Sequence, residues 1–386
     1  MHLVALIAGA LCLATWAYLL SAHGGFWKVW RLGAVVPAQD AVPGIVAVVI
    51  PARDEAQVIA RTVQSLLAQT CSDAIRIFIV DDHSSDGTAE AARQAAFDCG
   101  RPQAVEVISG SPLPKGWTGK LWAVQQGVAR ALLLKPAFLL LTDADIEHSP
   151  ENAATLIAIA ETGGYDLTSF MVKLHCRSLA ERLLIPPFVF FFFMLYPPAW
   201  IPDSRRKAAG AAGGCMLLRP QALERAGGIA AIRAHIIDDC ALARAIKQTG
   251  GKVWLGLAHE TCSTREYGSF AEIERMIART AFNQLQHSAL LLAGAVAGLA
   301  IAYLLPFALL LSGNSLLVGM EILCWLLMAL AYVPMVRFYD LNPAWALTLP
   351  LSATFYLFAT LHSAVKFWSG SGGEWKGRSQ DHSAAA

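Results

Sequence analysis

The sequence predicts an α/β domain whose sheet is covered by helices on both faces and which is joined to membrane-spanning helices at both ends. Three observations support this fold class. Short apolar runs alternate with helical patterns, acidic residues follow three of these runs, and long stretches without charge flank the region. Strand–helix alternation is typical of sheets covered by helices, and roughly 20 apolar residues are enough to span a bilayer.

Charges are distributed unevenly along the 386 residues. The chain is 55% hydrophobic and 15% charged, yet residues 28–287 hold 26 of the 30 basic and 25 of the 29 acidic residues. This distribution indicates a globular domain between membrane segments, and it argues against a disordered, fibrous or simple cytosolic protein. Because the net charge is only +1, a nucleic-acid partner is not expected.

The uncharged stretches predict one N-terminal and two to four C-terminal membrane helices. Three C-terminal helices are expected, but they would leave Lys366, Lys376 and Arg378 on the less favoured side of the membrane. The first stretch is interpreted as an anchor rather than a cleaved signal peptide, because it lacks a basic start and exceeds the about 7–15 apolar residues of a signal. Spans are expected near 3–22, 289–311, 316–336 and 344–366.

These spans suggest a division of the chain into four parts. They are an N-terminal anchor (1–27), the α/β domain (40–287), C-terminal helices (288–368) and a tail (369–386). Lys28 and Arg31 follow the first span, so the tendency of basic residues to stay inside places the α/β domain in the cytoplasm.

Residues 188–196 read FVFFFFMLY and stand between two pairs of prolines. Nine residues are too few to cross a bilayer. One interpretation buries them in the core of the domain. The favoured one treats 183–201 as an interfacial segment that dips into the edge of the bilayer, where aromatic residues are common.

Within the α/β domain, four strands and four helices are expected. Continuous runs rich in Val, Ile and Leu indicate buried parallel strands, and apolar residues at helical spacing indicate the helices. The strands are 44–50, 75–80, 105–108 and 137–142, and the helices are 57–69, 88–97, 121–134 and 241–249.

Three acidic clusters directly follow the first, second and fourth of these strands. They are Asp54 with Glu55, Asp81 with Asp82, and Asp143 with Asp145. Ligands of such sheets bind at the carboxyl ends of the strands, so the clusters should converge on one crevice. The Asp143-Ala-Asp145 pair is a reasonable clamp for Mg²⁺ or Mn²⁺, which prefer oxygen ligands.

Two further segments carry candidate site residues. The turn 114–120 precedes a helix, so its backbone N–H groups and Lys120 could bind an anion, although an ordinary solvated turn is the alternative. Asp238 and Asp239 also precede a helix. One carboxylate there could be an N-cap, but a pair exceeds what a cap needs, so one of them could act as a general base.

Taken in order, several motifs resemble the family 2 glycosyltransferases, membrane-bound enzymes of the GT-A fold that use nucleotide-diphospho-sugars. The motifs are PARDE (51–55), VDDHSSDGT (80–88), GWTGK (116–120), LTDAD (141–145), AAGGCMLLRP (211–220) and IDDCALARAIK (237–247). The resemblance covers about residues 40–280. Within the family, the chain is most similar to the bacterial hopene-associated glycosyltransferases.

The resemblance implies a role for each matching residue. Asp239, with Asp238 beside it, would be the catalytic base, and Asp143 and Asp145 would hold Mg²⁺ or Mn²⁺. The nucleotide-sugar would be bound by Pro51, Ala52, Arg53, Glu55, Asp81, Asp82, Lys120 and Asp143. The implied reaction is in-line displacement at the anomeric carbon with inversion.

One motif departs from the family. Many membrane members carry (Q/R)-x-x-R-W after the base, whereas here Arg275 is followed by Arg279 one residue late and the Trp is missing. Single transfer is therefore expected rather than polymer synthesis. The two arginines lie four residues apart and share a helix face, so one of them could contact the acceptor or a phosphate.

The expected function is transfer of a sugar from a nucleotide-diphospho-sugar, with UDP as the expected nucleotide, to the hydroxyl of a membrane lipid in hopanoid biosynthesis. The expected location is the bacterial inner membrane. Transfer to a polyprenyl phosphate or a ceramide-like lipid is the alternative within the class. A non-catalytic scaffold that binds nucleotide-sugars is the alternative outside it, but decay of the site would remove a carboxylate, and all three clusters are intact.

Overall fold

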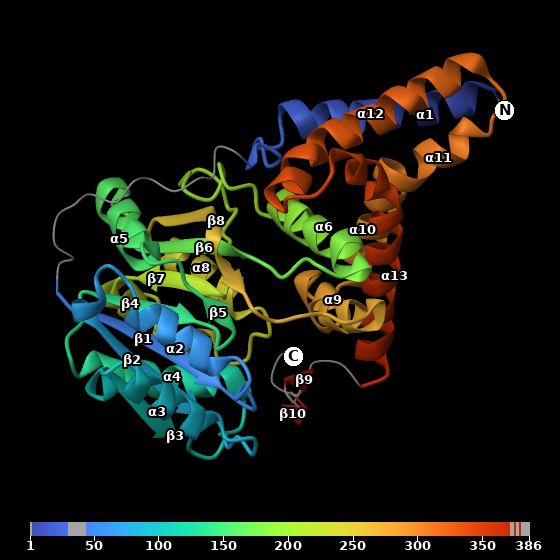
Figure 1. Ribbon diagram of the computed structural model, residues 1–386. Helices are drawn as coiled ribbons and strands as arrows, with labels where there is room; N and C mark the ends of the chain where they lie inside the picture. Colours follow the sequence, from blue (N-terminus) through green and yellow to red (C-terminus); the bar gives the residue numbers. More distant parts are fainter. Residues whose placement is uncertain (1, 30–43, 371–373, 376–377, 380–386) are drawn as a thin grey trace. The chain divides into compact units, whose positions relative to one another are not determined.

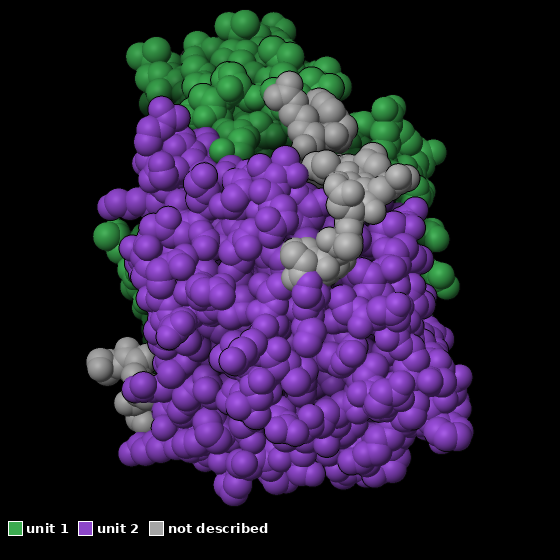
Figure 2. All heavy atoms as spheres, turned by 90° about the vertical axis from the view of Figure 1, so that its left-hand side faces the viewer, with its two compact units in different colours: residues 1–31, 176–199, 266–373 green, residues 32–175, 200–265, 374–386 purple. Residues whose placement is uncertain are grey.

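The computed structural model describes residues 2–29, 44–370, 374–375 and 378–379. Contacts within the chain define two compact units, which Figure 2 distinguishes by colour. Unit 1 comprises Met1–Arg31, Cys176–Ala199 and Glu266–Gly373, and unit 2 comprises Leu32–His175, Trp200–Arg265 and Glu374–Ala386. Two segments inside the expected 40–287 domain, 176–199 and 266–287, are thus grouped with unit 1.

Unit 2 is built on an eight-stranded sheet of order β3-β2-β1-β4-β7-β6-β8-β5 (Figure 1). Its strands are β1 (Val46–Ala52), β2 (Ile75–Asp81), β3 (Val105–Ser109), β4 (Phe138–Thr142), β5 (Ile146–Glu147), β6 (Leu167–Lys173), β7 (Cys215–Leu218) and β8 (Val253–Ser263). The four strands expected from the sequence are β1–β4, and they pair in parallel. The half that contains β7 and β5 is mixed, because both pair antiparallel with their neighbours.

Helices cover both faces of this sheet, as expected. Side chains alternate between the two faces along a strand. Val48 and Ile50 of β1 face the core shared with α2, α3 and α5, whereas Val49 faces α4. The helices are α2 (Ile59–Leu67), α3 (Thr88–Asp98), α4 (Gly119–Leu132), α5 (Asn152–Gly163), α7 (Pro220–Arg225) and α8 (Asp238–Gln248).

Helix α4 approaches the sheet closely at Gly127. A Cβ at this position would lie 2.5 Å from Cγ1 of Val49 and 3.0 Å from Cγ2 of Val80. Glycine is therefore required for the close contact, and the contact holds the N-terminal turn of α4 at the carboxyl end of the central strands.

Unit 1 is helical. Its helices are α1 (His2–Ser21), α6 (Leu179–Leu195), α9 (Phe270–Gln284), α10 (Ala289–Leu299), α11 (Leu305–Leu310), α12 (Ser315–Phe338) and α13 (Leu349–Trp368), with a π-helical turn at Ala300–Leu304. Four stretches are long and apolar enough to span a membrane: Leu3–Ser21, Ala289–Leu310, Ser315–Phe338 and Pro343–Trp368. The expectation of one N-terminal and three C-terminal apolar helices is confirmed at this level.

Residues 188–195 of the aromatic segment belong to helix α6, and Tyr196 is the C-cap of this helix. This helix begins with a capping box between Ser178 and Glu181, and it continues through Pro186 and Pro187 instead of starting after them. The ring of Phe190 packs 5.2 Å from that of Tyr332, within unit 1. Phe190, Phe191 and Phe193 are thus buried among apolar helices rather than in the core of the sheet. A position at the bilayer edge stays a prediction.

The tail contains a short hairpin in its described part. Strands β9 (Glu374–Trp375) and β10 (Arg378–Ser379) pair antiparallel as a separate two-stranded sheet.

Candidate active site

The first acidic clusters meet where β1 and β2 end side by side. Parallel pairing aligns Ala52 with Asp81, and the N–H of Asp82 donates to the carbonyl of Ala52 at 2.8 Å. Asp82 is buried, and Arg53 Nη1 donates to its carbonyl oxygen at 2.6 Å and lies 3.5 Å from its Oδ2. Pro51, Ala52, Arg53, Asp81 and Asp82, all assigned to nucleotide binding by the resemblance, are therefore adjacent.

The loop after β1 is tied to the loop after β2. Asp54 adopts a left-handed backbone conformation, with a φ of 51°, and its Oδ1 accepts a 2.9 Å hydrogen bond from the N–H of Ser85. The N–H of Glu55 donates to Thr88 Oγ1 at 2.8 Å. These bonds hold the two loops together, and they direct the carboxylate of Asp54 to the loop after β2.

Asp143 and Asp145 follow β4, as expected, and each forms an ion pair with a different basic side chain. Lys120 Nζ lies 2.9 Å from Asp143 Oδ1, and Arg265 Nε lies 2.7 Å from Asp145 Oδ2. Burial raises the pKa of Asp143, the positive charge of Lys120 lowers it, and the charges of Asp145 and Asp238 raise it further, with a net upward shift. The carboxylate of Asp143 is therefore poorly hydrated and lies close to other negative charges as well as to Lys120.

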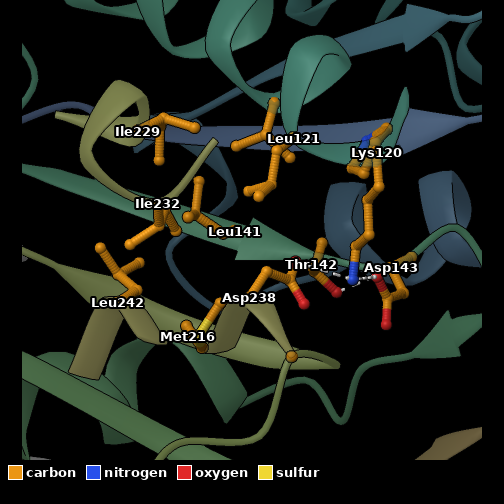
Figure 3. A pocket seen from close by; sticks show the side chains of 13 residues that line it. Lys120, Leu121, Leu141, Thr142, Asp143, Met216, Ile229, Ile232, Asp238 and Leu242 are labelled. Atoms are coloured by element: carbon orange, nitrogen blue, oxygen red, sulfur yellow. Dashed lines mark hydrogen bonds and ion pairs between the residues drawn. The ribbon is translucent and has the colours of Figure 1, made fainter. Parts of the chain in front are cut away.

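Lys120 lies in the first turn of α4, behind the N-cap Thr118. Figure 3 shows its side chain extended toward Asp143 and Asp238, and its Nζ lies 3.2 Å from Asp238 Oδ2. Burial disfavours the charge on Lys120, but the attraction of Asp143 and then of Asp238 outweighs it and raises the pKa. The sequence predicts Lys120 at an anion site, and in the structure its ammonium group forms ion pairs with two carboxylates.

Asp238 and Asp239 form the first turn of α8, and the interpretation of either as an N-cap is wrong. The N-cap is Ile237, which makes no side-chain capping bond. Asp239 Oδ2 instead accepts a 2.9 Å hydrogen bond from the N–H of Gly213, and its Oδ1 accepts one of 2.6 Å from Cys240. The pKa of Asp239 is raised to about 6, mainly by burial and to a lesser extent by the negative charge of Asp238. A carboxylate with such a pKa is well suited to accept a proton near neutral pH.

A cavity lies between these groups and the sheet (Figure 3). Lys120, Asp143 and Asp238 form its polar end. Its other lining residues are mostly apolar: Pro51, Leu121, Val124, Leu141, Thr142, Gly213, Met216, Ile229, Ile232 and Leu242. The ionic groups are thus partly shielded from water, which strengthens their interactions.

A buried polar layer supports the loop that carries Asp143 and Asp145. His148 lies between Thr142 Oγ1, at 3.1 Å, and Asn152 Nδ2, at 3.0 Å. Burial lowers the pKa of His148 to about 3, so its ring is neutral and acts as a hydrogen-bonding spacer. Thr142 also donates to the carbonyl of Gly214 at 2.7 Å, which links this loop to the segment that holds Asp239.

Two site residues were missed at the sequence level. Arg265 bridges Glu55 and Asp145, and Gly213 orients Asp239. A signal existed for each: Arg265 follows a long apolar strand, and Gly213 lies in a motif that was recognised but given no role. Neither partner could be named, because strands β7 and β8 were not among the expected elements.

The side chains present fit a divalent cation bound together with a phosphate group. Glu55, Asp143, Asp145, Asp238 and Asp239 are carboxylates, and among the described residues Lys120 and Arg265 form ion pairs with members of this set. This excess of hard oxygen donors suits Mg²⁺ or Mn²⁺, which are often held by one or two carboxylates and by substrate phosphates. Among the described residues, no group of three His, Cys, Asp or Glu side chains is arranged to hold a metal by itself.

Arg275 and Arg279 belong to α9 of unit 1. Both side chains are exposed and lie one turn apart, so they share a face as expected. The carboxylates of the candidate site all belong to unit 2. Contact of either arginine with an acceptor or a phosphate stays a prediction.

Comparison with known proteins identifies the class of this domain. Residues 47–227 match the family described as "Glycosyl transferase family 2". An uncharacterised protein of Methanocaldococcus jannaschii is 29% identical over 120 residues, which are 31% of this chain and 43% of the relative. The chain therefore spans less than half the length of that curated relative.

One solved mannosyltransferase structure resembles the chain in fold, and a second solved structure is less similar. The mannosyltransferase PcManGT from Pyrobaculum calidifontis, in complex with GDP-Man and Mn²⁺, has a TM-score of 0.53 at 18% identity, with 93% of this chain and 99% of that chain covered. Glucosyl-3-phosphoglycerate synthase from Mycobacterium tuberculosis, with Mn²⁺ and UDP-Glc, has a TM-score of 0.38 at 16% identity, with 62% and 79% covered.

The family match lies on the strands and loops that carry the acidic clusters. It begins at residue 47 in β1 and ends at residue 227, and it includes Asp82, Asp143 and Asp145. The mannosyltransferase resemblance extends over almost the whole of both chains. Together with the mixed α/β sheet, these findings confirm the expected fold class, and they support the expected class of enzyme: residues 47–227 match family 2 glycosyltransferases, and the chain has the fold of a solved mannosyltransferase.

Proposed function

We propose that the protein transfers a sugar from a nucleotide-diphospho-sugar to the hydroxyl group of a membrane lipid, with inversion at the anomeric carbon. The proposed acceptor is a hopanoid or a related polycyclic alcohol, and the proposed donor is a UDP-sugar. The observation that carries the proposal is Asp239, a partly buried carboxylate with a raised pKa that is oriented by the backbone of Gly213.

The reaction follows from the arrangement of these side chains. Asp239 accepts the proton of the acceptor hydroxyl, and the oxygen attacks the anomeric carbon from the side opposite the diphosphate. The bond between that carbon and the diphosphate oxygen breaks, and its electron pair leaves with the nucleotide. Attack from the opposite side inverts the anomeric centre.

Lys120 stabilises the negative charge of the donor diphosphate, and Arg53 belongs to the region of the nucleoside. Lys120 lies at the polar end of the cavity, where its charge can pair with the departing diphosphate. Arg53 and Asp82 sit where β1 and β2 end, in the region proposed for the nucleoside. Asp143 and Asp145 would hold Mg²⁺ or Mn²⁺, which supplies Lewis-acid stabilisation of the diphosphate when bound.

The four apolar stretches support a lipid acceptor, because an amphiphile presents its hydroxyl at the surface of the bilayer. We place the protein in the bacterial inner membrane with the catalytic domain on the cytoplasmic side. In this proposal residues 1–27 anchor the chain, 40–287 perform the transfer with 183–201 at the interface, 288–368 span the membrane and 369–386 form a tail. Labelling of single cysteines from either side of the membrane tests the orientation.

The activity is tested with purified protein in lipid nanodiscs. The donors are UDP-glucose, UDP-N-acetylglucosamine and GDP-mannose, and the acceptors are a hopanoid alcohol, a polyprenyl phosphate and a ceramide. We expect mass spectrometry to detect one glycosylated hopanoid that depends on Asp239. Transfer only to polyprenyl phosphate or ceramide would contradict the acceptor, and no transfer with any pair would favour a binding scaffold.

A further inference from the structure

Arg265 clamps two carboxylates that lie far apart in the sequence, Glu55 and Asp145. Its Nη2 lies 2.8 Å and 3.1 Å from the two oxygens of Glu55, and its Nε lies 2.7 Å from Asp145 Oδ2. The side chains of Glu55 and Asp145 are only 12% and 10% exposed, so their charges are poorly hydrated. A guanidinium group is well suited to this bridge, because it presents several donors in a fixed plane.

The main chain places Arg265 at this point. Strand β8 pairs with β5 through Ile146 and Ser263, directly after Asp145. The N–H and the hydroxyl of Thr264 both donate to the carbonyl of Asp145, at 2.8 and 3.0 Å. Asp145 is thus held through its backbone by residue 264 and through its side chain by residue 265.

Asp145 is also a residue proposed to hold the divalent cation. A cation at Oδ2 and the guanidinium of Arg265 compete for the same negative charge, since like charges repel strongly in a partly buried site. A nucleotide diphosphate changes this balance. It brings oxygen ligands for the cation, and its negative charge offers Arg265 a new partner.

We propose that Arg265 occupies the place of the divalent cation at Asp145 until a nucleotide diphosphate arrives, and then transfers to the diphosphate. Arg265 is accordingly a positioning residue that makes the cation bind with the nucleotide and not before it. This inference rests on the proposed function, because it requires a metal-bound nucleotide donor. It extends that function by assigning the order in which the ligands bind.

The inference predicts opposite effects on two binding constants. Removing the guanidinium leaves Asp145 and Glu55 available to a free cation, so Arg265→Gln should bind Mn²⁺ alone about tenfold or more tightly than the parent protein. The same variant should bind UDP in the presence of Mn²⁺ about tenfold more weakly, because the diphosphate loses a charged partner. A purely structural clamp would weaken both interactions or neither.

The test measures free Mn²⁺ by electron paramagnetic resonance with the full-length protein in nanodiscs, without nucleotide. Arg225→Gln is the matched control, since Arg225 Nη2 pairs with Asp166 at 2.8 Å elsewhere in unit 2, and it should leave Mn²⁺ affinity unchanged. Asp145→Asn introduced into Arg265→Gln should cancel the gain. Arg265→Lys keeps a charge but cannot span both carboxylates, so we expect an intermediate affinity.

An unchanged or weaker Mn²⁺ affinity in Arg265→Gln, with its thermal unfolding transition retained, overturns the proposal. If Arg265→Gln does not fold, an unchanged or weaker Mn²⁺ affinity in Arg265→Lys overturns the proposal instead. The measurement requires neither sugar nor acceptor. Absence of sugar transfer in every donor and acceptor pair would therefore count against the proposed function alone, and an unaltered Mn²⁺ affinity in an active enzyme would count against the role of Arg265 alone.

Discussion

The backbone N–H of Gly213 donates a 2.9 Å hydrogen bond to Oδ2 of Asp239. This bond orients the carboxylate at the start of α8. The side chain of Lys120 is also close to Gly213, since a Cβ at position 213 would lie 3.6 Å from Lys120 Nζ. The proposed base therefore lies next to Lys120, the basic side chain proposed to stabilise the leaving group. Proton acceptance and charge stabilisation can be separated by mutation.

Replacing the base should abolish transfer while preserving donor binding. Asp239→Asn keeps the acceptor for the Gly213 N–H but cannot take a proton, so we expect kcat to fall by about 10²–10⁴-fold. Calorimetry with UDP and Mn²⁺ should give nearly the parent affinity. An equal loss of UDP binding would show that Asp239 acts in donor binding and not as the base.

The rate of transfer should depend on the ionisation of Asp239. Burial raises the pKa of Asp239 to about 6, so the basic form is lost as the pH falls below that value and kcat/KM should fall with it. The charge of Asp238 contributes to the raised pKa. Asp238→Asn should therefore move the acidic limb to lower pH, whatever it does to the maximal rate. A limb that stays in place, or moves to higher pH, would assign it to another group.

Removing the proposed metal ligand should weaken nucleotide binding only when the metal is present. Asp145→Ala is expected to reduce UDP affinity by about tenfold or more in Mn²⁺, because a cation bridges carboxylate and diphosphate in this proposal. With EDTA, the variant and the parent protein should bind UDP alike. If EDTA leaves the parent affinity unchanged, the metal clamp is wrong.

The close contact of α4 with the sheet should make the stability of the protein sensitive to a larger residue at position 127. Gly127→Val would place its side chain against Val49 and Val80, so we expect a loss of about 1–3 kcal/mol in the free energy of unfolding from overpacking. Ala129→Ser, at an exposed position of the same helix, should change it by less than about 0.5 kcal/mol. Thermal or denaturant unfolding of the two variants measures the difference, and equal stabilities would contradict the packing argument.

Local pattern in the sequence was sufficient for the parallel half of the sheet. Strands β1–β4 are continuous apolar runs, and the polar residues after them lie at one edge because parallel strands end on the same side. The apolar spans were predicted for the same reason, since a stretch of hydrophobic residues without charge is recognisable without knowledge of its partners. Helix α6 was harder, because Pro186 and Pro187 lie inside it instead of ending it.

The tertiary structure alone decided which charges meet. Arg265 is 210 residues from Glu55 in the sequence and 120 from Asp145, yet it contacts both. Lys120 looked like an anion ligand of a turn, but folding places it between Asp143 and Asp238. Sequence therefore determined the parallel half of the sheet, the acidic edge and the apolar spans. The pairing of strands far apart in the chain determined the ionic partners, because electrostatic interactions depend on distance in space.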